Sequence, residues 1–190
     1  MLCVLVSLLP AVIAGGYYFG LRAIYLVLLC TIGSVAMEGW CRILMKRSQT
    51  ISDLSAAVTG MLLAMNLPVS IPLWQAVFGA LVAMVAVKGL FGGIGKNFAN
   101  PAITARIVMF LAFSKSMTAW VFPDAVSSAT PLAMMANGES VDYLTLLLGN
   151  HGGCLGETSA LALLLGFAYL LIRGVISWHT PVCFVGTVFV

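Results

Sequence analysis

The sequence predicts an all-α polytopic membrane protein, a multi-span helical bundle in which some helices are short or broken. Hydrophobic residues make up 62% of the 190-residue chain and charged residues 8%, whereas soluble domains average about 45–50% and about 25%. Long apolar runs recur along the chain, separated by short stretches that hold the charged and turn-forming residues. The net charge of +3 is scattered between these runs, which argues against nucleic-acid binding.

Seven apolar stretches are candidate membrane helices, because a bilayer crossing needs roughly 20 apolar residues. They are Leu2–Phe19, Leu21–Trp40, Leu54–Leu67, Ile71–Val87, Ala102–Phe113, Thr158–Ile172 and Val175–Val190. We interpret the first stretch as a span and not as a signal peptide, because no positively charged region precedes it. The last stretch ends within an apolar run, so we expect the chain to be a truncated piece of a longer protein.

Two stretches, Leu54–Leu67 and Ala102–Phe113, are too short to cross a bilayer comfortably. Each follows a polar sequence that favours a helix start: Ser52 or Asp53 as N-cap of the first, and the Asn100-Pro101 pair at the start of the second. Short helices that begin inside a membrane protein are a usual way to hold a polar site at membrane depth. A tilted span or a locally thinned bilayer is an equal alternative.

The charged residues predict how the chain is arranged across the membrane. If the first span starts in the cytoplasm, alternation places Arg42, Lys46, Arg47, Lys88, Lys96 and Arg173 on the cytoplasmic side and Arg22 and Lys115 opposite, the expected positive-inside bias. The chain then divides into a first membrane bundle of about five spans (residues 1–115), an exterior loop (116–157) and further spans (158–190). The loop is expected to face the exterior or periplasm.

The exterior loop contains DAVSSATPLAMMANG (124–138), a small, hydroxylated and turn-prone stretch in an otherwise apolar chain. Pro131 suits the first position of a helix and Asn137-Gly138 suits its end, so Thr130 is a candidate N-cap. A hydroxyl beside free backbone N–H groups favours an anion, above all a phosphate. An ordinary Thr-Pro cap is the common alternative.

A second candidate site is the glycine-rich segment GLFGGIGKNFANPA (89–102), which leads into the helix start at Asn100. Its glycines allow close backbone approach, and its amides precede the helix. It matches neither a phosphate-binding loop nor a dinucleotide fingerprint, so nucleotide binding of those kinds is excluded. The segment is interpreted either as close helix packing through small residues or as a midplane pocket for a bound cofactor or a cation, lined by free carbonyls and amides.

Two charged residues within the apolar stretches need separate interpretation. Arg106 lies in the short stretch after Asn100, so we expect it to be buried at membrane depth, either with a functional role or paired with helix-terminal carbonyls. Glu38 precedes Arg42 by four positions, which is the favourable order for an ion pair on one helix. We interpret Glu38 as one partner of that local pair.

The sequence predicts no metal site and assigns no catalytic residue. No Cys-x-x-Cys pair is present, and neither His151 nor His179 has companions at ligand spacing. The cysteines are interpreted as small buried hydrophobes; they are Cys3, Cys30, Cys41, Cys154 and Cys183. No arrangement of serine, cysteine and histidine suggests hydrolysis.

The segment DAVSSATPL resembles the flavinylation motif Asp-x-x-Ser/Thr-x-Ala-Thr, in which a transferase moves FMN from FAD onto the final threonine as a phosphoester. ISDLSAAVTGMLLAMNLP, LFGGIGKNFANPA and ISWHTPV are similar to successive segments of the D subunit of the Rnf complex, an ion-translocating ferredoxin:NAD oxidoreductase. The resemblance covers nearly the whole chain. The related B subunit of the sodium-pumping NADH:quinone oxidoreductase is the alternative, and ISDLSAAVTG favours the Rnf pattern.

The resemblance implies that Thr130 carries covalent FMN. Asp124, Ser127 and Ala129 match the positions that define the motif, whereas Ala125 and Ser128 stand where the family often has glycine. These two departures put the flexibility of the loop in question, because glycine is the more permissive residue. The candidate cofactor-binding residues are Thr130, Asp124, Ser127, Ser128, Ala129, Pro131, Asn100 and Arg106.

The resemblance also implies a function. It implies a multi-pass subunit of a prokaryotic inner or plasma membrane that relays electrons through FMN and helps couple their transfer to Na⁺ or H⁺ transport. The implied fold is the first half of an inverted repeat and the start of the second, and a second flavin such as riboflavin is left open. The implied partners are the other Rnf subunits, including the extracytoplasmic flavin subunit, and membrane lipid.

The chain itself has no NAD fold and no cluster-ligating cysteine set, so it is expected to be one relay of a multi-subunit enzyme and not catalytic alone. The alternative from another class is a channel or transporter without flavin. Broken helices and glycine-rich elbows also serve solute pathways.

Overall fold

The computed structural model describes residues 1–46, 48, 51–91, 93, 95, 97, 99–120, 135–136, 147–149, 153–157 and 159–188. The α-helices with assigned bounds are α1 (Leu2–Phe19), α2 (Leu21–Leu44), α3 (Ser55–Met65), α4 (Leu73–Leu81), α5 (Pro101–Ala112), α6 (Ser114–Met117), α9 (Ala160–Ile172) and α10 (His179–Val188). Short 3-10 helices lie at η1 (Ile51–Asp53) and η3 (Leu155–Glu157), and η2 (Val82–Gly89) is a π-helix. Among the described residues no strand is formed, which confirms the all-α prediction.

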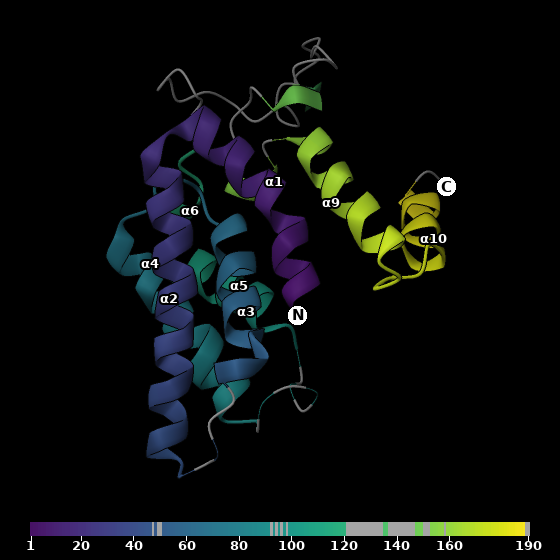
Figure 1. The fold of residues 1–190 in the computed structure, drawn as a ribbon. Helices are drawn as coiled ribbons and strands as arrows, with labels where there is room; N and C mark the ends of the chain where they lie inside the picture. Colours follow the sequence, from purple (N-terminus) through teal and green to yellow (C-terminus); the bar gives the residue numbers. More distant parts are fainter. Residues whose placement is uncertain are drawn as a thin grey trace.

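Helices α1 and α2 are the two described helices that are long and apolar enough to cross a membrane. They run in opposite directions and are joined at Gly20 (Figure 1). Gly20 has a φ of 71°, a left-handed conformation that glycine adopts at little cost, so a single residue reverses the chain. The end of the bundle that holds Gly20 and residues 118–120 is called the Gly20 end below.

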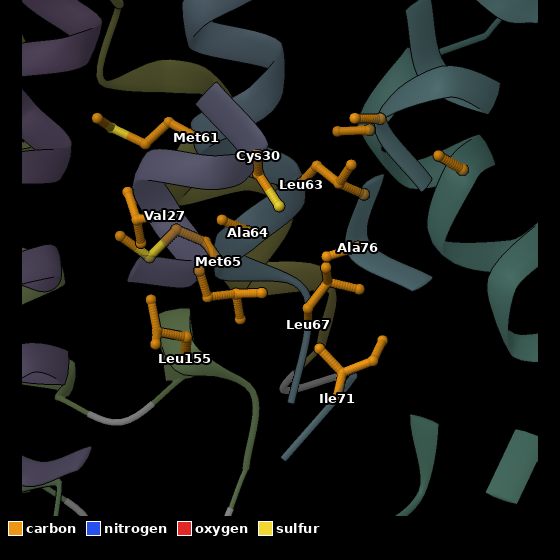
Figure 2. Close-up of a cluster of buried hydrophobic side chains, with 14 of the residues drawn as sticks. Val27, Cys30, Met61, Leu63, Ala64, Met65, Leu67, Ile71, Ala76 and Leu155 are labelled. Carbon is orange, nitrogen blue, oxygen red and sulfur yellow. The ribbon is translucent and has the colours of Figure 1, made fainter. Parts of the chain in front are cut away.

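The short helix α3 occupies the centre of the bundle and packs against α2, α4 and α5. Most of its residues are buried, and the core cluster of Figure 2 joins Met61, Leu63 and Met65 of α3 to Cys30 of α2. Leu155, which falls within the predicted exterior loop (116–157), also belongs to this core. Because α3 is surrounded by protein, its eleven residues need not match the thickness of a bilayer.

The structure confirms the predicted N-cap of α5 and contradicts the predicted N-cap of α3. Asn100 is the N-cap of α5, with its Oδ1 3.0 Å from the backbone nitrogen of Ala102, and Pro101 is the first helical residue. For α3 the prediction was wrong, because Leu54 is the N-cap and has a left-handed φ of 60°. That conformation separates Ser52 and Asp53, which belong to η1, from the helix. The Asp53 carboxylate still accepts a hydrogen bond from the Ser55 backbone N–H at 2.8 Å.

Replacing Asn100 with alanine is expected to lower the free energy of unfolding by about 1 kcal/mol, because the Ala102 N–H loses its acceptor. Thermal unfolding of the detergent-solubilised full-length protein measures the change. Asn100→Asp is the matched control, since aspartate caps helices as well as asparagine. Equal melting temperatures for the alanine and aspartate variants would contradict the capping role.

The later stretches fold differently from the prediction. The expected span Ile71–Val87 is α4 continued by η2, where the bonds Leu90 N–Val85 O (3.1 Å) and Gly93 N–Lys88 O (3.0 Å) follow the five-residue spacing of a π-helix. The expected span Val175–Val190 begins later, at His179. Gly174 ends the preceding helical run with a left-handed φ of 64°.

Candidate functional site

The turn between α3 and α4, residues 66–72, is held by a side chain from the start of α2. Arg22 donates through Nε to the Val69 carbonyl at 3.0 Å, and through Nη2 to the Ser70 and Ile71 carbonyls at 3.1 and 3.3 Å. A planar guanidinium binds three consecutive carbonyls more readily than a lysine would, because its donors are fixed in a fork. Arg22 therefore sets the backbone shape of the 66–72 turn at the Gly20 end.

The 66–72 turn also binds the chain on both sides of residues 121–152. Before these residues, the Ser70 hydroxyl donates to the Ala119 carbonyl at 2.6 Å. After them, the Leu155 N–H donates to the Leu67 carbonyl at 3.1 Å, and Pro68 forms an isolated antiparallel bridge with Cys154. Two positions separated by residues 120–153 are thus fixed on neighbouring residues of one turn.

Arg106 of α5 adds a second connection between the 66–72 turn and Cys154. Its Nη1 donates to Asn66 Oδ1 at 2.9 Å and its Nη2 donates to Cys154 Sγ at 3.1 Å. Asn66 is oriented in turn by its own bond to the Leu62 carbonyl at 2.8 Å. Arg106 was expected to be buried, but it is half-buried. Its described partners are two side chains, and not the helix-terminal carbonyls of one of the two interpretations.

Cys154 is itself enclosed, with a relative exposure of 1%. Burial, and after it the negative charge of Glu157, raises the pKa of the Cys154 thiol to about 12, although Arg106 acts in the opposite direction. The thiol is therefore neutral at physiological pH. The interpretation of the cysteines as buried hydrophobes holds for Cys30 and Cys41, is incomplete for Cys154 and is wrong for Cys183, which is exposed on α10.

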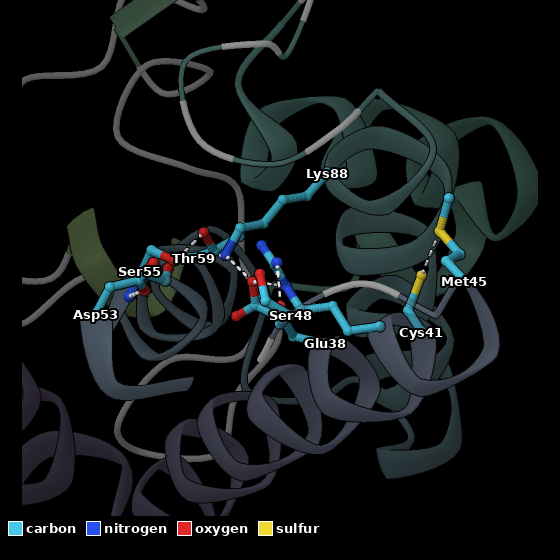
Figure 3. Close-up of polar contacts among 9 residues, drawn as sticks. Glu38, Cys41, Met45, Ser48, Asp53, Ser55, Thr59 and Lys88 are labelled. Carbon is cyan, nitrogen blue, oxygen red and sulfur yellow. Dashed lines mark hydrogen bonds and ion pairs between the residues drawn. The ribbon is translucent and has the colours of Figure 1, made fainter. Parts of the chain in front are cut away.

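A second polar cluster lies at the opposite end of the bundle. Lys88 Nζ of η2 is 2.8 Å from Glu38 Oε1 of α2 and 2.5 Å from the Ser55 hydroxyl of α3 (Figure 3). The predicted Arg42–Glu38 pair is present at 3.4 Å, but it is not the closest pairing of this carboxylate. The interpretation of Glu38 as one partner of a local ion pair is therefore confirmed but incomplete. Both Glu38 and Lys88 are almost fully buried.

Asp53 borders this cluster. Burial raises the pKa of Asp53, but the hydrogen bonds from Ser55 and the positive charges of Lys88 and Arg42 outweigh it, so the pKa lies below its ordinary value. The carboxylate is therefore negatively charged at neutral pH. Its contribution to stability is present above the unfolded-state pKa and is lost as the pH falls through the lower folded-state value.

The glycine-rich segment packs closely at Gly89 but not at Gly95, where an added Cβ would meet nothing within 4 Å. A Cβ added to Gly89 would lie 2.5 Å from Cys41 Sγ, which is the small-residue packing of one interpretation. The neighbouring pocket, lined by Glu38, Cys41, Arg42, Met45, Met84, Lys88, Gly89 and Gly93, leaves room for about one water molecule. Such a space is far too small for a flavin.

Of the predicted cofactor-binding residues, the structure describes Asn100 and Arg106. Asn100 caps α5, whereas Arg106 faces Asn66 and Cys154, and the two share no hydrogen-bond partner among those described. The other predicted residues lie outside the described residues: Asp124, Ser127, Ser128, Ala129, Thr130 and Pro131. Within the described part of the chain, no group of three or more His, Cys, Asp or Glu residues is placed to hold a metal ion.

Comparison with known proteins shows which family this chain resembles. The model of the NQR2, RnfD, RnfE family matches residues 1–190. The D subunit of the Na⁺-translocating ferredoxin:NAD⁺ oxidoreductase complex of Acetobacterium woodii is 45% identical over 97% of this chain. The D subunit of the proton-translocating complex of Clostridium ljungdahlii is 33% identical over 99% of it. The B subunit of the Na⁺-translocating NADH-quinone reductase of Ectopseudomonas mendocina is 40% identical over 64% of this chain.

The match extends over the whole chain but not over the whole of these relatives. It covers 61% of the Acetobacterium protein, 62% of the Clostridium protein and 33% of the Ectopseudomonas protein. The full-chain family match and the near-complete coverage at 45% identity confirm the resemblance drawn from the sequence segments. The chain therefore belongs to the NQR2, RnfD, RnfE family of helical membrane proteins.

Proposed function

We propose that this chain forms part of the D subunit of an ion-translocating ferredoxin:NAD oxidoreductase complex and relays electrons across it. The observation that carries the proposal is the identity of 45% over 97% of the chain to a protein named as such a subunit. The relative from the NADH-quinone reductase aligns with only 64% of the chain, so that enzyme is the second candidate. A flavin-free transporter is the third.

Thr130 is proposed to carry FMN as a phosphoester. Asp124, Ser127, Ala129 and Thr130 stand at the spacing of the flavinylation motif, and a threonine hydroxyl is chemically suited to form such an ester. The bound flavin would supply one- and two-electron transfer, while the protein would supply position and electrostatics. The chain's own contribution is the attachment hydroxyl and the fixed positions on either side of the loop at Ala119 and Cys154.

The coupled ion, the partners and the orientation belong to the same proposal. One relative is named as Na⁺-translocating and another as proton-translocating, so both ions stay candidates. The loop that contains Thr130 is proposed to face the exterior or periplasm of a prokaryotic cell membrane. The proposed partners are the other subunits of the complex, including an extracytoplasmic flavin subunit, and a second flavin such as riboflavin is compatible with this assignment.

The test is the covalent flavin itself. The full-length denatured subunit is expected to fluoresce in a gel under ultraviolet light and to carry the extra mass of one FMN group. Thr130→Ala is expected to abolish both signals, because the attachment hydroxyl is gone. Ser140→Ala, which removes a hydroxyl of the same predicted loop outside the motif, should keep both.

Persistent fluorescence in Thr130→Ala would reject Thr130 as the attachment site. A dark wild-type protein at its unmodified mass, from cells that flavinylate other proteins, would reject the covalent cofactor altogether. Ion flux through such an unmodified protein would favour the transporter.

A further inference from the structure

We propose that the Glu38 carboxylate and the Ser55 hydroxyl form a Na⁺-binding site, which the ammonium group of Lys88 occupies when the ion is absent. Na⁺ and Lys88 then bind there in turn. The inference deepens the proposed function, because its link to ion transport rests on the assignment of this chain to an ion-translocating complex. It names the ion, the residues that bind it and the residue that competes with it.

The contacts of Lys88 show that this position binds a monovalent cation. Its Nζ lies 2.8 Å from Glu38 Oε1 and 2.5 Å from the Ser55 hydroxyl (Figure 3). A carboxylate and a hydroxyl supply oxygen atoms, which are the ligands that hard cations prefer. The two residues come from α2 and α3, so two helices of the bundle hold the site. The space beside the pair, lined by Glu38, Arg42 and Lys88 among others, has room for about one water molecule, which is a further oxygen ligand.

Burial requires that the two cations exchange one for one. The side chains of Glu38 and Lys88 are each 4% exposed, and a buried charge that loses its partner is strongly destabilising. Arg42 contacts the same carboxylate at the longer distance of 3.4 Å, so it compensates only part of the charge. Lys88 therefore leaves Glu38 at low cost only when another positive charge takes its place. A singly charged ion such as Na⁺ keeps the charge of the site unchanged, whereas a divalent ion would add one buried charge.

Asp53 offers the displaced ammonium group a second carboxylate. Ser55 connects the two positions, because its hydroxyl contacts Lys88 Nζ and its backbone N–H donates to Asp53 Oδ1 at 2.8 Å. The positive charge of Lys88 already acts on the Asp53 carboxylate. Lysine carries its charge on a flexible four-carbon stem, so we expect the ammonium group to move toward Asp53 while η2 keeps its place. Asp53 is half-buried, which makes this second position the more hydrated of the two.

The test measures the binding of radioactive Na⁺ to the detergent-solubilised full-length subunit by equilibrium dialysis, with choline chloride keeping the ionic strength constant. Lys88→Met removes the competing cation and is expected to lower the Kd for Na⁺ by about tenfold or more, because a site that is open in a tenth of the molecules binds tenfold more weakly. The melting temperature of this variant should also rise with added Na⁺, since a ligand that binds only the folded state stabilises it.

Two control variants separate this site from general effects of charge. Lys46→Met removes an exposed lysine of the same end and should bind Na⁺ with the wild-type Kd. Glu38→Leu combined with Lys88→Met removes the carboxylate as well, so the gain in affinity should be lost. A Kd for Na⁺ in Lys88→Met that is no lower than that of the wild type would overturn the proposal, as would an equal gain in the double variant.

The outcomes also separate this inference from the proposed function. Na⁺ binding by the solubilised subunit needs neither a flavin nor electron transfer. A subunit without covalent flavin that binds Na⁺ more tightly as Lys88→Met would reject the flavin assignment and support the ion site. A flavin-bearing subunit in which Lys88→Met and wild type bind Na⁺ equally would overturn the ion site and leave the flavin assignment intact.

If Lys88→Met does not accumulate in the membrane, Asp53→Asn decides the matter. Asp53 is half-buried in the short helix η1, so the variant should fold. The displaced ammonium group of Lys88 then lacks its second carboxylate, and the Kd for Na⁺ is expected to rise severalfold. An unchanged Kd would overturn the proposal.

Discussion

Replacing Lys88 with methionine is expected to lower the free energy of unfolding by about 3–5 kcal/mol, the cost of leaving one member of a buried ion pair uncompensated. Lys88 Nζ contacts both the Glu38 carboxylate and the Ser55 hydroxyl, and the side chains of Lys88 and Glu38 are each 4% exposed. Arg42 contacts the same carboxylate at the longer distance of 3.4 Å, so it offsets only part of the loss. Thermal unfolding of the detergent-solubilised full-length protein measures the effect.

A double variant separates the charge from the packing. Glu38→Leu combined with Lys88→Met removes both charges and fills the space with apolar atoms, so its destabilisation should be much smaller than that of Lys88→Met alone. Lys46→Met, at an exposed lysine of the same end, should change the melting temperature little. If the Lys88→Met and Lys46→Met variants had the same melting temperature, the buried pair would have no energetic role.

Local signals in the sequence predicted much of the fold. The first predicted span, Leu2–Phe19, has the bounds of α1, because glycine at position 20 interrupts a continuous apolar run. The short helices α3 and α5 were expected from the lengths of their apolar runs. The Asn100-Pro101 start of α5 was predicted correctly, because an N-cap and its target N–H are only two residues apart.

Contacts between distant segments could not be predicted in the same way. The Glu38–Lys88 pair joins residues fifty positions apart, and the only local partner visible for Glu38 was Arg42. A lysine and a glutamate that each interrupt an apolar run were the available signal for that pair. The contacts of the 66–72 turn with Ala119 and Cys154 depend on which helix ends meet, and that is decided by the packing of the whole bundle.

The crossing of α2 and α3 gives the second large expected effect. Gly60 of α3 lies so close to α2 that an added Cβ would be 2.5 Å from the Cys30 carbonyl oxygen and 2.8 Å from Thr31 Cα and Ser34 Oγ. Two of these atoms are backbone atoms of a long helix, so they cannot rotate away. Close backbone approach through small residues is how membrane helices gain packing energy.

Gly60→Ala is therefore expected to destabilise the full-length protein by about 1–3 kcal/mol, the usual cost of overpacking a tight interface. Gly33 of α2 is the matched control, because a Cβ there meets only Ala80 Cβ, at 4.0 Å. Gly33→Ala should instead stabilise the protein by about 0.5–1 kcal/mol, since alanine loses less conformational freedom than glycine in a helix. Melting temperatures that shift in opposite directions would show that the α2–α3 distance is set by Gly60. Melting temperatures that both rise would mean that helix propensity, and not this close approach, decides both.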